Sequence, residues 1–92
     1  MTMAERIERK LTAAFAPAQL EIRDDSHKHA GHGGWREGGE THFHVTIVSE
    51  AFAGQSRGAR QRAIYAALAD ELAERVHALQ LATLTPEEAA RR

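Results

Sequence analysis

The sequence predicts an α+β domain of two layers, in which helices cover one face of a small sheet. Two observations predict it. Apolar residues recur alternately with helical and strand periodicity, in the order helix, strand, strand, helix, helix, strand. The chain of 92 residues has the length of a single domain, spanning residues 1–92, and its 42% hydrophobic and 27% charged content is ordinary for a globular protein.

An apolar stripe at helical spacing predicts the first helix; its members are Met3, Ile7 and Leu11. Thr2 and Glu5 have the spacing of a capping box, so the helix is expected to begin near the first residue. Pro17 is expected to end it. Alternation of apolar and polar residues over 20–23 then predicts a short strand.

A long connection and a second strand follow. Residues 25–40 are predicted to form a long flexible loop, since the connection holds five of the seven glycines and far exceeds a hairpin turn. The clearest strand covers 41–48, where alternate residues point to opposite faces of the sheet. One face is expected to carry Phe43, Val45 and Ile47, and the other His42, His44 and Thr46. Phe52 is expected to anchor the turn that follows.

The C-terminal half begins with a helical pattern over 57–78, in which apolar residues repeat every four positions: Ile64, Leu68, Leu72 and Val76. So long a helix is unusual in a small domain, and we expect a break near Leu72–Glu74. A last strand is predicted at 79–83. Thr85 followed by Pro86 then predicts a short C-terminal helix or tail over 86–92.

Histidine is the residue type that indicates chemistry. The chain has six histidines and no cysteine, and five of the histidines lie between positions 27 and 44. Neutral imidazole is the commonest protein ligand for metals, so the chain can offer nitrogen but no thiolate sulfur. The alternatives are structural: His42 and His44 would be the polar face of a strand, and His77 would cap the C-terminal end of a helix.

Several classes of function are disfavoured by the composition. A formal net charge of −1 argues against a generally basic nucleic-acid-binding protein. No secretory signal and no long apolar stretch is present, so a soluble cytoplasmic protein without a membrane partner is expected. No nucleophile arrangement and no phosphate-binding loop appears, so we expect no enzymatic activity.

Five segments resemble the BolA family over nearly the whole chain. They are 25–32 (DSHKHAGH), 39–43 (GETHF), Val48-Ser49-Glu50 with Phe52 and Gly54, 60–65 (RQRAIY), and 76–79 (VHAL). Gln61 departs from the family pattern, in which Arg-His-Arg is typical. The resemblance implies a class II KH-like αββααβ fold with a three-stranded mixed sheet.

The resemblance also implies a function. BolA proteins are partners of monothiol glutaredoxins, and the pair shares a 2Fe–2S cluster. Carried over by position, His77 is one ligand and a loop histidine is the other, either His29 or His32, with His29 preferred. The partner's cysteine and glutathione would complete the coordination. The sequence leaves the oligomeric state open, including a homodimer.

Two other functions remain open at this point. Some family members are described as transcriptional regulators, and Arg57, Arg60 and Arg62 cluster where a helix begins, so DNA binding through a KH-like helix-turn-helix face is the main alternative. Gly54 and Gly58 do not have the Gly-x-x-Gly spacing of RNA-binding KH loops. A zinc or nickel buffer built from the loop histidines is the third candidate, although no four-ligand spacing is present.

Overall fold

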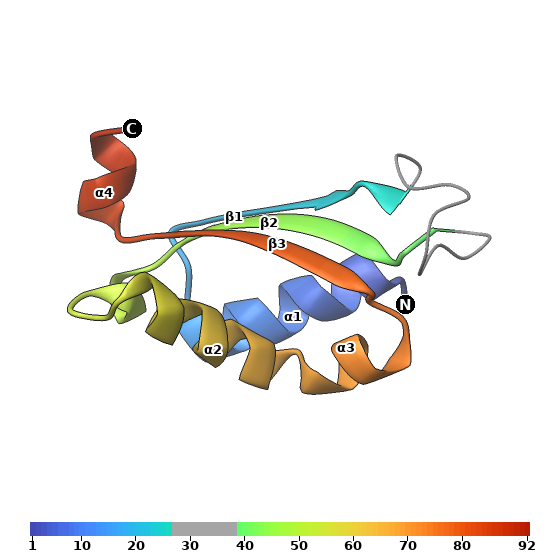
Figure 1. Ribbon diagram of the computed structural model, residues 1–92. Helices are drawn as coiled ribbons and strands as arrows, with labels where there is room; N and C mark the ends of the chain where they lie inside the picture. Colours follow the sequence, from blue (N-terminus) through green and yellow to red (C-terminus); the bar gives the residue numbers. More distant parts are fainter. Residues whose placement is uncertain (27–38) are drawn as a thin grey trace.

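The computed structural model describes residues 1–26 and 39–92, and its elements follow the predicted order (Figure 1). They are α1 (Met3–Phe15), β1 (Gln19–Asp24), β2 (His42–Val48), the 3-10 turn η2 (Glu50–Phe52), α2 (Arg57–Ala67), α3 (Ala69–Glu74), β3 (Ala78–Leu84) and α4 (Pro86–Ala90). This order confirms the predicted α+β class.

The three strands form one mixed sheet in the order β1-β2-β3. β1 runs antiparallel to β2, with Ile22 opposite Val45, and β3 runs parallel to β2, with Leu81 opposite the same valine. A parallel pair needs a crossover connection, which α2 and α3 supply. Figure 1 shows α1, α2 and α3 together on one face of the sheet, while α4 projects from the end of β3 on the other side.

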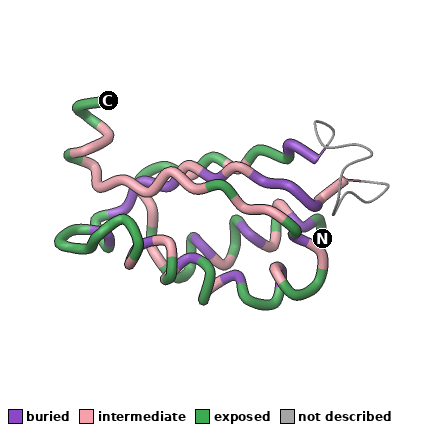
Figure 2. The backbone as a smooth tube through the Cα atoms, in the orientation of Figure 1, coloured by how far each residue is buried: buried purple, intermediate pink, exposed green. Residues whose placement is uncertain are grey.

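The core lies between the sheet and the helix layer, where the buried residues gather (Figure 2). Alternate residues of β2 point into it, as predicted. Phe43, Val45 and Ile47 are at most 2% exposed. Phe52 is fully buried, and its ring lies 5.3 Å from that of Phe15, so its predicted role as an anchor is confirmed. Around them pack Met3, Ile7, Leu11, Ile64, Leu68 and Val76.

Both predicted helix starts are present. The Thr2 hydroxyl accepts a hydrogen bond from the Glu5 N–H (3.1 Å), and the Glu5 carboxylate accepts one from the Thr2 N–H (3.0 Å). Thr85 and Glu88 make the same reciprocal pair at α4. Each pair satisfies N–H groups that the first turn of a helix leaves without a partner. α1 ends before Pro17, as expected.

The predicted break between the last two helices of the helix layer is misplaced. It falls at Leu68, and α3 ends at Glu74 instead of continuing to Ala78. A helix turns by about 100° per residue, so an apolar repeat every four residues drifts by about 40° at each step. A straight helix from Ile64 to Val76 would therefore rotate the last apolar residues away from the sheet. The early break restores their contact with the core.

A buried carboxylate joins α3 to α1. Glu71 is 1% exposed, and its two oxygens lie 2.9 Å from the Lys10 ammonium and 2.9 Å from the Arg6 guanidinium. Burial alone would raise the pKa of Glu71, but the hydrogen bond from Lys10 and the nearby cations lower it.

None of the helices within residues 1–26 and 39–92 is long and apolar enough to cross a membrane.

Candidate functional site

His77 is an exposed side chain on a fixed backbone. It lies between α3 and β3, and its N–H donates to the Thr41 carbonyl (2.7 Å), as does the N–H of Ala78 (3.1 Å). The alternative role as a helix cap is wrong, because α3 ends at Glu74 and Arg75 is its C-cap. The backbone of His77 is therefore fixed beside the sheet, and its side chain is open to solvent.

His42 lies against His77. The parallel pairing of β2 and β3 places Ala78 opposite His42, and this register brings the two imidazole rings to 5.4 Å between centroids, tilted by 52°. His42 is only 5% exposed, so it does not belong to a solvent-facing polar side of the strand. Its Nδ1 lies 2.8 Å from the Thr41 hydroxyl. His44, two residues on, is half-buried.

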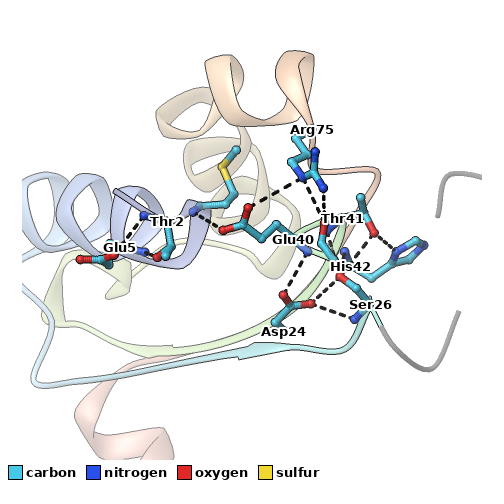
Figure 3. Close-up of polar contacts among 10 residues, drawn as sticks. Thr2, Glu5, Asp24, Ser26, Glu40, Thr41, His42 and Arg75 are labelled. Atoms are coloured by element: carbon cyan, nitrogen blue, oxygen red, sulfur yellow. Dashed lines mark hydrogen bonds and ion pairs between the residues drawn. The ribbon is translucent and has the colours of Figure 1, made fainter. Parts of the chain in front are cut away.

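Asp24 and Ser26 tie the two ends of the segment 27–38 together (Figure 3). One oxygen of Asp24 accepts from the Ser26 N–H (2.9 Å) and from the Ser26 hydroxyl, and the other accepts from the Glu40 N–H (3.0 Å). The Ser26 hydroxyl oxygen in turn accepts from the N–H groups of Thr41 (2.9 Å) and His42 (3.1 Å). The start and the end of the segment therefore meet beside the two histidines.

Arg75 fixes the end of the same segment from the helix side. Its guanidinium donates to the Gly39 carbonyl from Nε (3.0 Å) and from Nη2 (2.8 Å), as Figure 3 shows. Gly39 has a φ of 75°, a conformation that favours glycine, and an added Cβ would lie 3.4 Å from the Asp24 carboxylate. Arg75 is two residues before His77, so the same short stretch of chain binds Gly39 and carries the exposed imidazole.

The predicted loop ligands, His29 and His32, lie outside the described residues. Within the two described ranges, no group of three or more His, Cys, Asp or Glu side chains could hold a metal ion. The arrangement that the structure does describe is a pair of imidazoles, one exposed and one buried. The exposed imidazole of His77 can donate nitrogen to a metal whose other ligands come from elsewhere.

The predicted arginine cluster is divided. Arg57 and Arg62 are exposed on α2, whereas Arg60 is 8% exposed and directed inward. The Arg60 guanidinium donates to the carbonyls of Gln55 and Thr83 (3.0 Å each), and lies 5.8 Å above the Phe52 ring. Arg60 is therefore not part of the predicted nucleic-acid surface, because its hydrogen-bond donors are occupied inside the protein.

Sequence reasoning missed the inner part of this site. Asp24, Ser26 and Thr41 did not stand out as candidates, because such polar residues are common near loops. Their hydrogen bonds join residues up to 16 positions apart and depend on the pairing of β1 with β2. The signals were indirect: Ser26 and Thr41 lie in the segments 25–32 and 39–43, which belong to the pattern that the chain shares with BolA proteins.

Comparison with known proteins gives a consistent result. The family model described as "BolA-like protein" matches residues 11–88. An uncharacterized protein of Sinorhizobium is 48% identical, with 99% of both chains covered. The protein of Escherichia coli named DNA-binding transcriptional regulator BolA is 47% identical, covering 96% of this chain and 80% of that protein.

A SufE-like protein of Arabidopsis is 46% identical over 90% of this chain, which spans only 24% of that longer protein. The solved BolA domain of Arabidopsis SufE1 matches with a TM-score of 0.86 at 44% identity, covering 96% of each chain. BolA1 from mouse gives a TM-score of 0.80 at 37% identity, covering 97% of this chain and 69% of that one. The names of these relatives describe a regulator and a SufE-like protein, and none describes an enzyme of known reaction.

Proposed function

The chain belongs to the BolA-like protein family, and from this premise we propose that it binds a monothiol glutaredoxin and shares a 2Fe–2S cluster with it. His77 supplies one ligand, and His29 or His32 supplies the second. The role is assembly or delivery of the cluster, or iron regulation, with no bond made or broken in a substrate.

One observation supports the proposal most. The exposed imidazole of His77 lies beside the residues that flank the segment 27–38. His77 and Arg75 bond to Thr41 and Gly39 after the segment, and the N–H of Thr41 donates to Ser26 before it. A metal bound by His77 would thus lie near Ser26 and Gly39, the two described residues between which the loop histidines stand in the sequence. A ligand on a fixed backbone needs little ordering when a partner docks.

The donor chemistry also suits a shared cluster. The chain has no cysteine, so the thiolates that hold iron–sulfur clusters must come from the glutaredoxin and from glutathione. Replacing two thiolates by imidazoles on one iron raises the reduction potential of a 2Fe–2S centre. Imidazole binds metal only when neutral, so the complex should weaken in mildly acidic solution. Because glutathione is abundant in the reducing cytoplasm, we also propose a cytoplasmic location for the protein.

Visible circular dichroism of the reconstituted mixture tests the proposal. A cluster-loaded monothiol glutaredoxin with glutathione should change its spectrum when this protein is added, because the iron ligands change. His77→Ala should abolish the change, and His44→Ala, which alters a half-buried histidine of the same sheet, should keep it. A mixture whose spectrum equals the sum of its parts contradicts the proposal.

The same measurement assigns the loop ligand. If His29 is the ligand, His29→Ala should remove the change and His32→Ala should keep it; the reverse result assigns His32. Retention of the full change in the double variant would remove both loop histidines from the proposal.

DNA binding is the second candidate, and a specific observation favours it. Relatives in Escherichia coli and Vibrio cholerae are named DNA-binding transcriptional regulators, at 47% and 44% identity. Arg57 at the start of α2 and Arg62 in the middle of the helix are exposed, and basic side chains on a helix can contact phosphate groups. Both functions can coexist, since the two arginines belong to α2 whereas His77 follows α3, and Figure 1 shows the start of α2 and the end of α3 at opposite ends of the helix layer.

A further inference from the structure

The hydroxyl hydrogens beneath His77 can be assigned by counting donors and acceptors. Ser26 must donate its hydroxyl hydrogen to Asp24, because an ionised carboxylate only accepts. The two lone pairs of the Ser26 oxygen are taken by the N–H groups of Thr41 and His42. Ser26 therefore has no remaining place for another donor.

The hydroxyl of Thr41 then has a single acceptor to which it can donate. Its oxygen lies 3.3 Å from the Ser26 oxygen and 2.8 Å from Nδ1 of His42. Since Ser26 is saturated, Thr41 donates to Nδ1, and neutral His42 carries its hydrogen on Nε2. In this tautomer neither ring nitrogen of His42 has a lone pair for a metal: Nδ1 accepts from Thr41 and Nε2 is protonated.

His42 nevertheless contacts the proposed ligand. Its ring is 5% exposed, is held by the Thr41 hydroxyl, and lies 5.4 Å from the His77 ring. A buried ring with a fixed orientation limits the rotamers of a neighbouring exposed ring.

We propose that His42 is a positioning residue for His77. The hydrogen bonds from Asp24 through Ser26 and Thr41 orient the His42 ring, and that ring holds the His77 imidazole ready for the metal of a docked partner. The inference rests on the proposed function, and it assigns His42 a role distinct from that of a ligand.

The first test uses the metal-free protein. Long-range proton–nitrogen NMR should show His42 with a bare Nδ1 and a protonated Nε2. In His42→Ala the side-chain couplings of His77 should move toward the average of several rotamers. A His42 that carries its hydrogen on Nδ1, or an unchanged rotamer distribution of His77 in His42→Ala, overturns the proposal.

The second test uses the complex with the cluster-loaded glutaredoxin and follows affinity and spectral shape separately. Thr41→Val removes the hydroxyl with little change of shape and should weaken the complex by about 10-fold, the lower end of the usual effect of residues that orient metal ligands. Thr41→Ser keeps the hydroxyl and should restore wild-type affinity. His42→Ala should weaken binding while the spectrum of the complex that forms keeps its wild-type shape.

The outcomes separate the two proposals. Loss of the spectral change in His42→Ala, as in His77→Ala, would make His42 a ligand and overturn its positioning role. Wild-type affinity in Thr41→Val would also overturn it. If His77→Ala itself has no effect, His77 is not a ligand and the proposed ligation is wrong, and the NMR result on the metal-free protein still decides the orientation of His42.

Discussion

The guanidinium of Arg60 and the carboxylate of Glu88 form a two-point ion pair, with Nη1–Oε1 at 2.6 Å and Nη2–Oε2 at 3.3 Å. The pair joins α2 to α4 across 28 positions of sequence. Because Arg60 also donates to the carbonyls of Gln55 and Thr83, it links the turn before α2, the end of β3 and the C-terminal helix.

Replacing Arg60 should therefore destabilise the fold. Arg60→Ala leaves two carbonyls and a carboxylate without their buried donor, and the midpoint of thermal unfolding should fall by several degrees. Arg57→Ala, which removes an exposed arginine of the same helix, should change the free energy of unfolding by less than about 0.5 kcal/mol. Equal effects of the two changes would contradict the structural role of Arg60.

Stability should fall in acid. The hydrogen bond from Arg60, followed by that from the Thr85 N–H, lowers the pKa of Glu88 from 4.5 to about 2. A carboxyl with a lowered pKa in the folded state contributes stability above about pH 4.5, and this contribution disappears as the pH falls toward 2. Urea unfolding at several pH values between 7 and 2 measures it.

The Glu88→Gln variant is the control for that titration, because its side chain does not ionise. Its unfolding midpoint should depend less on pH than that of the wild type below pH 4.5. Added salt should reduce the difference, since the Glu88 side chain is 36% exposed. Identical pH profiles would show that the Arg60–Glu88 pair does not contribute.

The contact of α1 with the sheet should carry much of the stability. Leu11 is fully buried in the core, so Leu11→Ala should lower the free energy of unfolding by about 2–5 kcal/mol. Thr12→Ala changes the next, exposed residue of the same helix and should have little effect. Chemical unfolding compares the two, and a small loss for Leu11→Ala would contradict the assigned core.

DNA binding, if present, should depend on the two exposed arginines. Each phosphate contact contributes about 0.9 to the slope of log affinity against log salt. Arg57→Gln with Arg62→Gln should therefore reduce the slope by about 2, as measured by fluorescence anisotropy at several salt concentrations. An unchanged slope in this double variant would exclude these side chains as phosphate contacts.

The periodicity of the sequence predicted most of the fold, because the local signals agree with the tertiary structure. The capping boxes at Thr2 and Thr85 and the alternation along β2 all depend on residues within a few positions of one another. The predicted break near Leu72–Glu74 lies four to six residues after the observed one at Leu68. Asp70 and Glu71 follow it in the first turn of α3, where acidic residues are favoured, and this was the signal that could have located it.

The site could be predicted only in part. The exposed position of His77 agrees with its proposed role, but the burial of His42 and of Arg60 depends on partners distant in sequence. The Ser26 hydroxyl, 16 positions away, accepts from the N–H of His42, and Glu88, 28 positions away, holds Arg60 from the last helix. Interactions of this kind have no spacing that a single sequence reveals.

Pulsed electron paramagnetic resonance of the reduced cluster tests the central proposal most directly. The protein is prepared with nitrogen-15 in its histidine rings and mixed with an unlabelled, cluster-loaded monothiol glutaredoxin and glutathione. We expect a strong hyperfine coupling from nitrogen-15, lost in His77→Ala and kept in His44→Ala. A spectrum with no directly bound nitrogen-15 in the wild-type mixture would contradict ligation of the cluster by this protein.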